Sequence, residues 1–145
     1  MIMTQEEKKD LLLKDICSRL PYFTKAQINN EIVVLDSICN DDGYYFNFID
    51  NDREGVNIEN IKPYLFPLSS MTEEQKEELF FNYIHNDIYF DDFTDYFLAG
   101  ELWHDICVSI DILPSLIDWF NKNKIDWRGL IPMGLALDAT GLNIY

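Results

Sequence analysis

Apolar residues recur every three or four positions between residues 4 and 21, which is the spacing of a helix with one buried face. The run Thr4-Gln-Glu-Glu7 that opens this segment is a capping box, in which a threonine hydroxyl and a glutamate carboxylate accept from the first free amides. Pro21 closes the segment. We therefore predict a first helix whose apolar stripe is Leu12, Leu13, Ile16, Cys17 and Leu20.

The pattern changes after this helix to short apolar runs separated by turn formers. Some of these runs are rich in β-branched residues and others alternate between apolar and polar positions, and both patterns are typical of strands. The predicted strands lie near Tyr22 to Ile28, then at 31–39, 44–49 and 56–58. They predict a four-stranded antiparallel meander over residues 22–61. The sequence does not distinguish an open sheet from a small SH3-like barrel.

Residues 62–71 form a connector with two prolines. Pro63 and Pro67 each lack a backbone donor and favour extended backbone in the residue before them. The neighbouring residues Tyr64, Leu65 and Phe66 are too apolar for a solvated linker. We therefore predict a buried connector that crosses the core.

Helical patterns predominate after the connector. A second capping box at residues 72–75 opens a helix with Leu79 and Phe80 on its apolar face. A short helix ending at Gly100 and a longer one that Pro114 kinks or restarts are expected to follow, and then a short helix near residues 130–138 of an apolar tail. The expected fold is one α+β domain over residues 1–145, with an N-terminal helix, the small meander, and residues 72–145 as a helical part with a packed tail.

The charge balance narrows the possible partners. The chain has 26 acidic and 11 basic residues, a net charge of −15, which repels phosphate backbones and anionic membranes. Direct nucleic-acid binding and membrane binding are therefore not expected, whereas a basic protein partner is compatible with this charge. Cys17, Cys39 and Cys107 occur in no metal or redox motif and are expected to be small buried residues in a reducing compartment, which places the protein in the cytoplasm.

Negative charge is concentrated where aromatic residues are frequent. Residues 77–121 contain ten acidic residues and no Lys or Arg. A solvated acidic face over an aromatic core is the simplest interpretation. Two functional alternatives remain open: exposed rings that anchor a basic partner, and carboxylates that imitate the phosphates of a nucleic acid. The candidate interaction residues are Tyr89, Phe90, Asp91, Asp92, Phe93, Asp95, Tyr96 and Phe97.

Patterns that would indicate an enzyme or a metal site are weak. Residues 50–55 resemble the start of a calcium loop, but the twelfth position is Ile61 instead of glutamate, so a hairpin turn is favoured. His85 and His104 lie near carboxylates, as they must in so acidic a chain, and metal binding or acid–base catalysis is only a distant alternative. Because the chain has no nucleophile elbow and no phosphate-binding loop, we expect no enzyme activity and no cofactor.

Several strings of residues resemble a known group of proteins. They are IKPYLFPLSSMTEE at 61–74, DWFNK at 118–122, DWRGLI at 126–131 and GLALDATGLNIY at 134–145, with LLLKDICSRLP at 11–21 similar as well. These segments are similar to uncharacterised short proteins of gut anaerobic bacteria and of their phages or mobile elements. The group has no known activity, so the resemblance implies only a mobile-element setting. Its members are expected to differ at residues 82–108.

Overall fold

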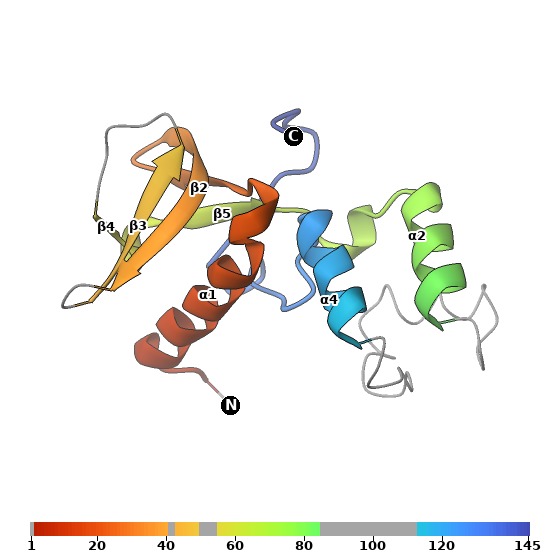
Figure 1. The fold of residues 1–145 in the computed structure, drawn as a ribbon, viewed down its shortest axis with the longest axis horizontal. Helices are drawn as coiled ribbons and strands as arrows, with labels where there is room; N and C mark the ends of the chain where they lie inside the picture. Colours follow the sequence, from red (N-terminus) through yellow and green to blue (C-terminus); the bar gives the residue numbers. More distant parts are fainter. Residues whose placement is uncertain (1, 41–42, 50–54, 85–112) are drawn as a thin grey trace.

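The structure, a computed structural model, describes residues 2–40, 43–49, 55–84 and 113–145 (Figure 1). The described part combines helices with a mixed, mainly antiparallel sheet, which confirms the predicted α+β class. The helices are α1 (Gln5–Arg19), α2 (Glu73–Leu79) and α4 (Leu113–Lys122), with a π-helical turn at Phe80–Ile84 and short 3-10 turns at Leu20–Tyr22, Ile58–Asn60 and Leu68–Ser70. The strands are β1 (Lys25–Ile28), β2 (Glu31–Asn40), β3 (Tyr44–Ile49), β4 (Val56–Asn57), β5 (Lys62–Leu65) and β6 (Leu137–Asp138).

The sheet has the strand order β4-β3-β2-β1-β5-β6. Strands β1 to β4 pair antiparallel in sequence order, as the predicted meander requires. Asn29 and Asn30 join β1 to β2 with φ angles of 49° and 67°, the left-handed backbone that a two-residue hairpin turn needs and that Asn tolerates. The edges of the described sheet are β4 and β6, so pairing between these strands does not close it into a barrel.

The proline connector is itself a strand of this sheet. Residues 62–65 form β5, which pairs antiparallel with β1 through Ala26–Pro63 and Gln27–Lys62. Pro63, Tyr64 and Leu65 are buried, which confirms the predicted burial for the part of the connector that forms β5, whereas residues 66–68 are half-buried. The predicted end of the sheet at residue 61 was wrong. The prolines favour extended backbone, and this backbone can also form strand hydrogen bonds beside β1.

The apolar tail folds back onto the same strand. Phe66 bridges Ile125 in parallel, and β6 then pairs parallel with β5 at Tyr64–Leu137 and Leu65–Asp138. The predicted helix at residues 130–138 was wrong. The buried Asp126 carboxylate accepts from the backbone N–H groups of residues 130 and 131 at 2.7 and 2.8 Å, which holds a tight turn in place of a helix.

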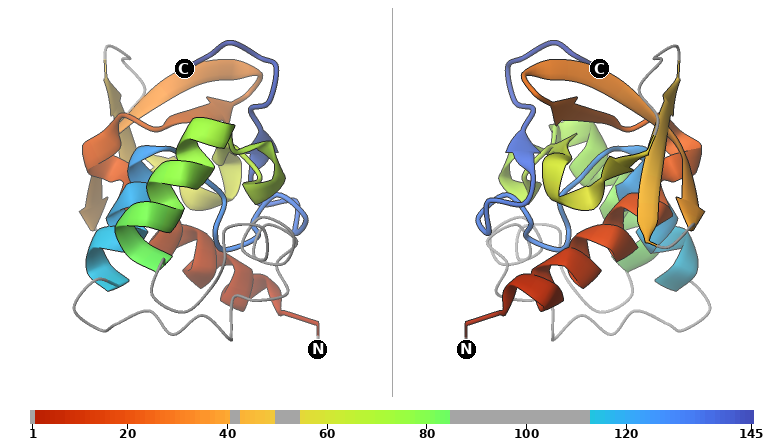
Figure 2. Two further views of the ribbon diagram at one scale, coloured as in Figure 1. Left: turned by 90° about the vertical axis from the view of Figure 1, so that its right-hand side faces the viewer. Right: turned by 90° about the vertical axis from the view of Figure 1, so that its left-hand side faces the viewer.

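The core lies between α1, the sheet and the tail (Figures 1 and 2). Leu12 and Ile16 of α1 pack with the inward residues of β1 to β3 and with Leu130 and Ala136 of the tail. Both arms of the predicted capping box are present at the start of α1, Thr4 N–H to Glu7 at 2.7 Å and Glu7 N–H to Thr4 at 3.2 Å. The first helix is therefore confirmed, and α1 buries Leu12 and Ile16 of its predicted stripe against the sheet.

The predicted burial of the cysteines was wrong at the two described positions. Cys17 and Cys39 are both exposed and free. Cys17 lies one residue beyond the buried Ile16, so the apolar stripe of α1 is narrower than its spacing suggested. Cys39 lies near the end of β2, where the strand runs beyond the core. Cys107 is outside the described residues.

A fully buried ion pair joins α1 to the tail. The Asp15 carboxylate accepts from Arg19 Nε at 2.8 Å and from Arg19 Nη2 at 3.1 Å, and both side chains are completely enclosed. Arg19 Nη2 also donates to the carbonyl of Ile125 at 2.8 Å. Arg128 Nε lies 3.3 Å from Asp15 Oδ1, an ionic contact without hydrogen-bond geometry. One carboxylate thus balances two guanidinium groups from segments more than 100 residues apart.

The substitution Asp15→Ala tests this cluster. Removing the carboxylate leaves Arg19 buried without a counterion, which should lower the free energy of unfolding by about 3–5 kcal/mol. Urea unfolding measures the loss, and Asp10→Ala on the exposed side of α1 is the matched control, with an expected change within about 0.5 kcal/mol. The double variant Asp15→Leu/Arg19→Met should be more stable than Asp15→Ala because it removes the uncompensated buried charge. Equal losses for Asp15→Ala and Asp10→Ala would contradict the assignment.

The side chain of Tyr145 fastens the tail across β1 and β5. Its hydroxyl donates to the carbonyl of Tyr64 at 2.8 Å and accepts from the Lys25 backbone N–H at 2.8 Å. The ammonium groups of Lys25 and Lys124 lie 5.6 and 5.3 Å from the centre of its ring. Although 44% of Tyr145 is exposed, its hydroxyl lies against the backbone of β1 and β5, and the desolvation of the hydroxyl raises the pKa of Tyr145 to about 12 from the ordinary value of 10. The neutral phenol is therefore the form that stabilises the fold.

Tyr145→Phe should reveal this contribution through its pH dependence. The folded pKa lies above the unfolded one, so the stability gained from Tyr145 is complete below about pH 10 and is lost as the pH rises towards 12. At pH 8 the variant should be less stable by about 1 kcal/mol because it loses two hydrogen bonds. Urea unfolding of both proteins should show this difference shrinking by pH 11. A difference that stays constant from pH 8 to pH 11 would refute the linkage.

Candidate interaction surface on the second helix

The aromatic and acidic residues predicted from sequence as an interaction surface, at positions 89–97, lie outside the described residues. So do the two helices expected before Pro114, both histidines and most of the loop that resembles a calcium site. The described ranges hold 14 acidic and 10 basic residues, a net charge of −4, so 11 of the 15 net negative charges belong to the remaining residues. The described part of the acidic stretch begins on α2 and resumes with Asp118 on α4.

Helix α2 begins as the sequence predicts. Thr72 and Gln75 form both arms of a capping box, with distances of 3.0 and 3.1 Å between the backbone nitrogens and the side-chain oxygens. Leu79 is fully buried at the end of the helix, and Phe80 is buried at the start of the π-helical turn that continues it. The burial of these two side chains fixes the apolar side of the segment, so its opposite side faces solvent.

The solvent-facing side of this segment combines carboxylates with an aromatic ring. We call it the α2 acidic face. Phe81 is 62% exposed, next to the buried Phe80, and the two rings meet edge to face with centroids 5.3 Å apart. Glu77 and Glu78 precede Phe81 by four and three positions, so all three share one side of a helix. The α2 acidic face consists of the exposed residues Glu73, Glu74, Glu77, Glu78 and Phe81.

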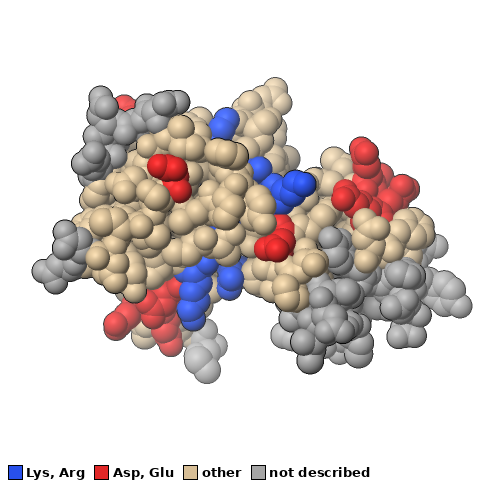
Figure 3. Space-filling model, viewed as in Figure 1, with Lys and Arg blue, Asp and Glu red and all other residues tan. Residues whose placement is uncertain are grey.

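The charges of the α2 acidic face are only partly balanced. Lys76 donates to Glu73 at 3.0 Å, and no ion pair within the described residues involves Glu74, Glu77 or Glu78. Glu73 and Glu74 lie in the first turn, where the helix dipole favours negative charge. Glu78 follows Glu74 by four positions, and like charges at that spacing repel each other. Acidic side chains gather over α2 in the space-filling view (Figure 3).

Sequence reasoning did not single out Phe81. The run Leu79-Phe80-Phe81 contained the signal, because successive residues on a helix point about 100° apart, so Phe81 points about 200° away from Leu79 and a stripe that holds Leu79 and Phe80 leaves it outside. Leu79 and Phe80 were predicted on the buried side, and the structure confirms both. The ring beside them is therefore the one that faces solvent.

The geometry of the α2 acidic face favours contact with a protein cation. Carboxylates attract Lys and Arg, and an exposed ring offers apolar area that such a contact can bury. No group of three or more His, Cys, Asp or Glu side chains in the described ranges is placed to hold a metal ion. Among the same residues, no helix has the length and apolar character needed to cross a membrane.

Comparison with known proteins adds no further assignment. The chain matches no protein-family model, no curated protein and no solved structure.

The two adjacent phenylalanines should respond differently to truncation. Phe80→Ala removes a ring that is only 6% exposed and should lower the free energy of unfolding by about 3–5 kcal/mol. Phe81→Ala removes a ring that is mostly exposed, together with its edge-to-face contact with Phe80, so its cost should be about 1 kcal/mol or less. Urea unfolding of both variants checks the contrast. Similar losses would show that the Phe81 ring belongs to the core.

Proposed function

We propose that this protein is a non-catalytic interaction domain that binds a basic protein partner through its acidic surface. The observation that carries the proposal is the α2 acidic face, where an exposed ring adjoins carboxylates that have no cationic partner within the described residues. The resemblance of the chain to short proteins of mobile elements favours a bacterial or phage setting. The free thiols of Cys17 and Cys39 are compatible with a reducing, cytoplasmic location.

The charges of the α2 acidic face destabilise the free protein slightly and would favour binding of a cationic partner. Repulsion between neighbouring carboxylates such as Glu74 and Glu78 is unfavourable in the free protein, and a cationic partner would relieve it. Attraction between opposite charges also speeds encounter, with an effect that decreases as salt is added. A partner with Lys or Arg around an apolar cleft would match both the charges and the ring of Phe81.

Aromatic residues contribute disproportionately to such contacts. A ring that enters a cleft on the partner loses its remaining exposed area, and the surrounding polar groups then exclude water from the contact. Phe81 has the required exposure, and its contact with Phe80 limits the orientations the ring can take. We assign Phe81 as the anchor and Glu74, Glu77 and Glu78 as the charges around it.

Mimicry of a nucleic acid is the second candidate function. It is favoured by the 11 net negative charges on the residues outside the described ranges. So many negative charges would suit a partner whose natural ligand is a polyanion such as DNA or RNA. Under this alternative the partner is a DNA- or RNA-binding protein, and the acidic chain occupies its nucleic-acid site. Competition with DNA distinguishes the two candidates. Duplex DNA of arbitrary sequence should displace this protein from a DNA-binding partner, but not from a basic partner that has no nucleic-acid site.

Capture from a host lysate by the immobilised full chain tests the proposed function. The wild type should retain a basic protein at 0.1 M salt and release most of it at 1 M, where the screening length falls from about 10 to 3 Å. Once that protein is purified, Phe81→Ala should weaken its binding on the order of 30-fold, as expected for an anchor ring. Glu77→Gln/Glu78→Gln should weaken it and flatten its salt dependence.

Phe23→Ala is the matched control for the anchor. Phe23 is 66% exposed, like Phe81, but lies between α1 and β1, away from the α2 acidic face. Binding should be the same in this variant as in the wild type. Retention that is insensitive to salt, or equal losses from Phe23→Ala and Phe81→Ala, would refute the proposal.

A further inference from the structure

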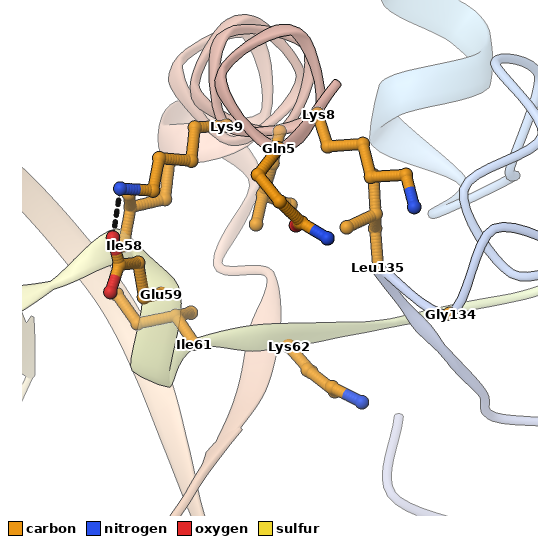
Figure 4. A pocket seen from close by; sticks show the side chains of 10 residues that line it. Gln5, Lys8, Lys9, Ile58, Glu59, Ile61, Lys62, Gly134 and Leu135 are labelled. Atoms are coloured by element: carbon orange, nitrogen blue, oxygen red, sulfur yellow. Dashed lines mark ion pairs between the residues drawn. The ribbon is translucent and has the colours of Figure 1, made fainter. Parts of the chain in front are cut away.

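A groove beside α1 has the chemistry of a small-molecule site, and it is independent of the α2 acidic face. It is a hollow of about 370 Å³ between α1, the 3-10 turn Ile58–Asn60, the start of β5 and the tail (Figure 4). Small-molecule pockets in proteins are typically about 300–1,000 Å³. The residues that line the groove are Gln5, Lys8, Lys9, Leu12, Ile58, Glu59, Ile61, Lys62, Gly134 and Leu135.

The inner wall of the groove is apolar. Leu12, Ile58 and Ile61 are all buried, with at most 7% of any of them exposed, and Leu135 adds a half-buried side chain from the tail. These residues come from α1, from residues 58–61 and from the tail. Leu12, Ile58 and Ile61 belong to the core between α1 and the sheet, which fixes the first two segments. The apolar wall is therefore held in place by the fold.

The rim of the groove carries positive charge, which is unusual in a chain with a net charge of −15. Glu59 pairs with Lys9 on one side of α1. Lys8 extends on the other side towards Leu135, with Gln5 between the two lysines, whereas Lys62 extends from β5 away from α1 (Figure 4). No ion pair with a described residue neutralises Lys8 or Lys62. Lys8 is thus a cation that extends towards the apolar wall and has no ion pair with a described residue.

Opposite charges are unevenly distributed around α1. Lys8 lines the groove, Gln5 and Lys9 lie where the groove adjoins a second hollow, and Glu6 and Asp10 line that second hollow. A ligand in the groove would therefore meet an ammonium group and an amide above an apolar wall. That combination complements a molecule with one carboxylate and an apolar body.

We propose that the groove binds a small amphipathic monocarboxylate. The Lys8 ammonium and the Gln5 amide hold the carboxylate, and the apolar body packs on Leu12, Ile61 and Leu135. Both the carboxylate and the apolar body of the ligand are needed for binding. A single surface lysine binds a carboxylate only weakly, and an apolar wall by itself does not fix the orientation of a bound molecule.

Methyl NMR of the full chain with octanoate tests the proposal. Octanoate should cause saturable shifts at the methyl groups of Leu12, Ile58, Ile61 and Leu135. Acetate, which lacks the apolar body, and octylammonium, which has the opposite charge, should not cause them at the same concentrations. Equal shifts with octylammonium would overturn the assignment of the carboxylate to Lys8, and the absence of saturable shifts with octanoate would overturn the site itself.

The variant Lys8→Met isolates the charge because it keeps the apolar stem of the side chain. It should weaken octanoate binding about tenfold, as expected for the loss of a charge-assisted contact. Lys14→Met removes an exposed lysine from another side of α1 and should bind octanoate as the wild type does. Urea unfolding confirms that both variants are folded. Unchanged binding in folded Lys8→Met would overturn the proposal.

Discussion

The buried contact of Asp15 with Arg19 and Arg128 is the constraint on which the arrangement of the chain depends. The Arg19 guanidinium and the Asp15 carboxylate are fully removed from water, with the half-buried Arg128 beside them, and this burial is tolerable only while the charges stay paired. Arg19 also binds the carbonyl of Ile125, the residue that bridges Phe66 next to β5. The position of α1 over the sheet is thereby coupled to the path of the tail. An incorrect path would leave a buried charge without a partner.

Strand β5 is the second element that integrates the fold, because segments from both ends of the chain meet at it. It pairs with β1 on one side and with β6 on the other, and the Tyr145 hydroxyl binds the Tyr64 carbonyl. The parallel pairing of β5 with β6 requires a long connection, and α2, α4 and the residues between them provide it. That connection includes the most acidic part of the chain.

The two proposed sites have opposite charge and lie on different elements. The α2 acidic face combines unbalanced carboxylates with the exposed Phe81 ring, whereas the groove beside α1 places Lys8 near an apolar wall. A net charge of −15 describes neither site by itself, since local charge decides what each surface can bind. An amphipathic carboxylate at α1 and a basic protein at α2 would not compete directly for the same groups.

Local patterns in the sequence determined the elements with local causes: both capping boxes, the strands from β1 to β4, the burial of the proline connector and the α+β class. These follow from side-chain spacing and turn chemistry within a few residues. Tertiary structure alone decided that the connector joins the sheet, that the tail forms β6 in place of a helix, and that Cys17 and Cys39 face solvent. It also decided that Lys8 overhangs an apolar wall. The places of the connector and of the tail depend on partners distant in sequence, β1 for β5 and β5 for β6, and spacing along the chain contains no information about which distant segments meet.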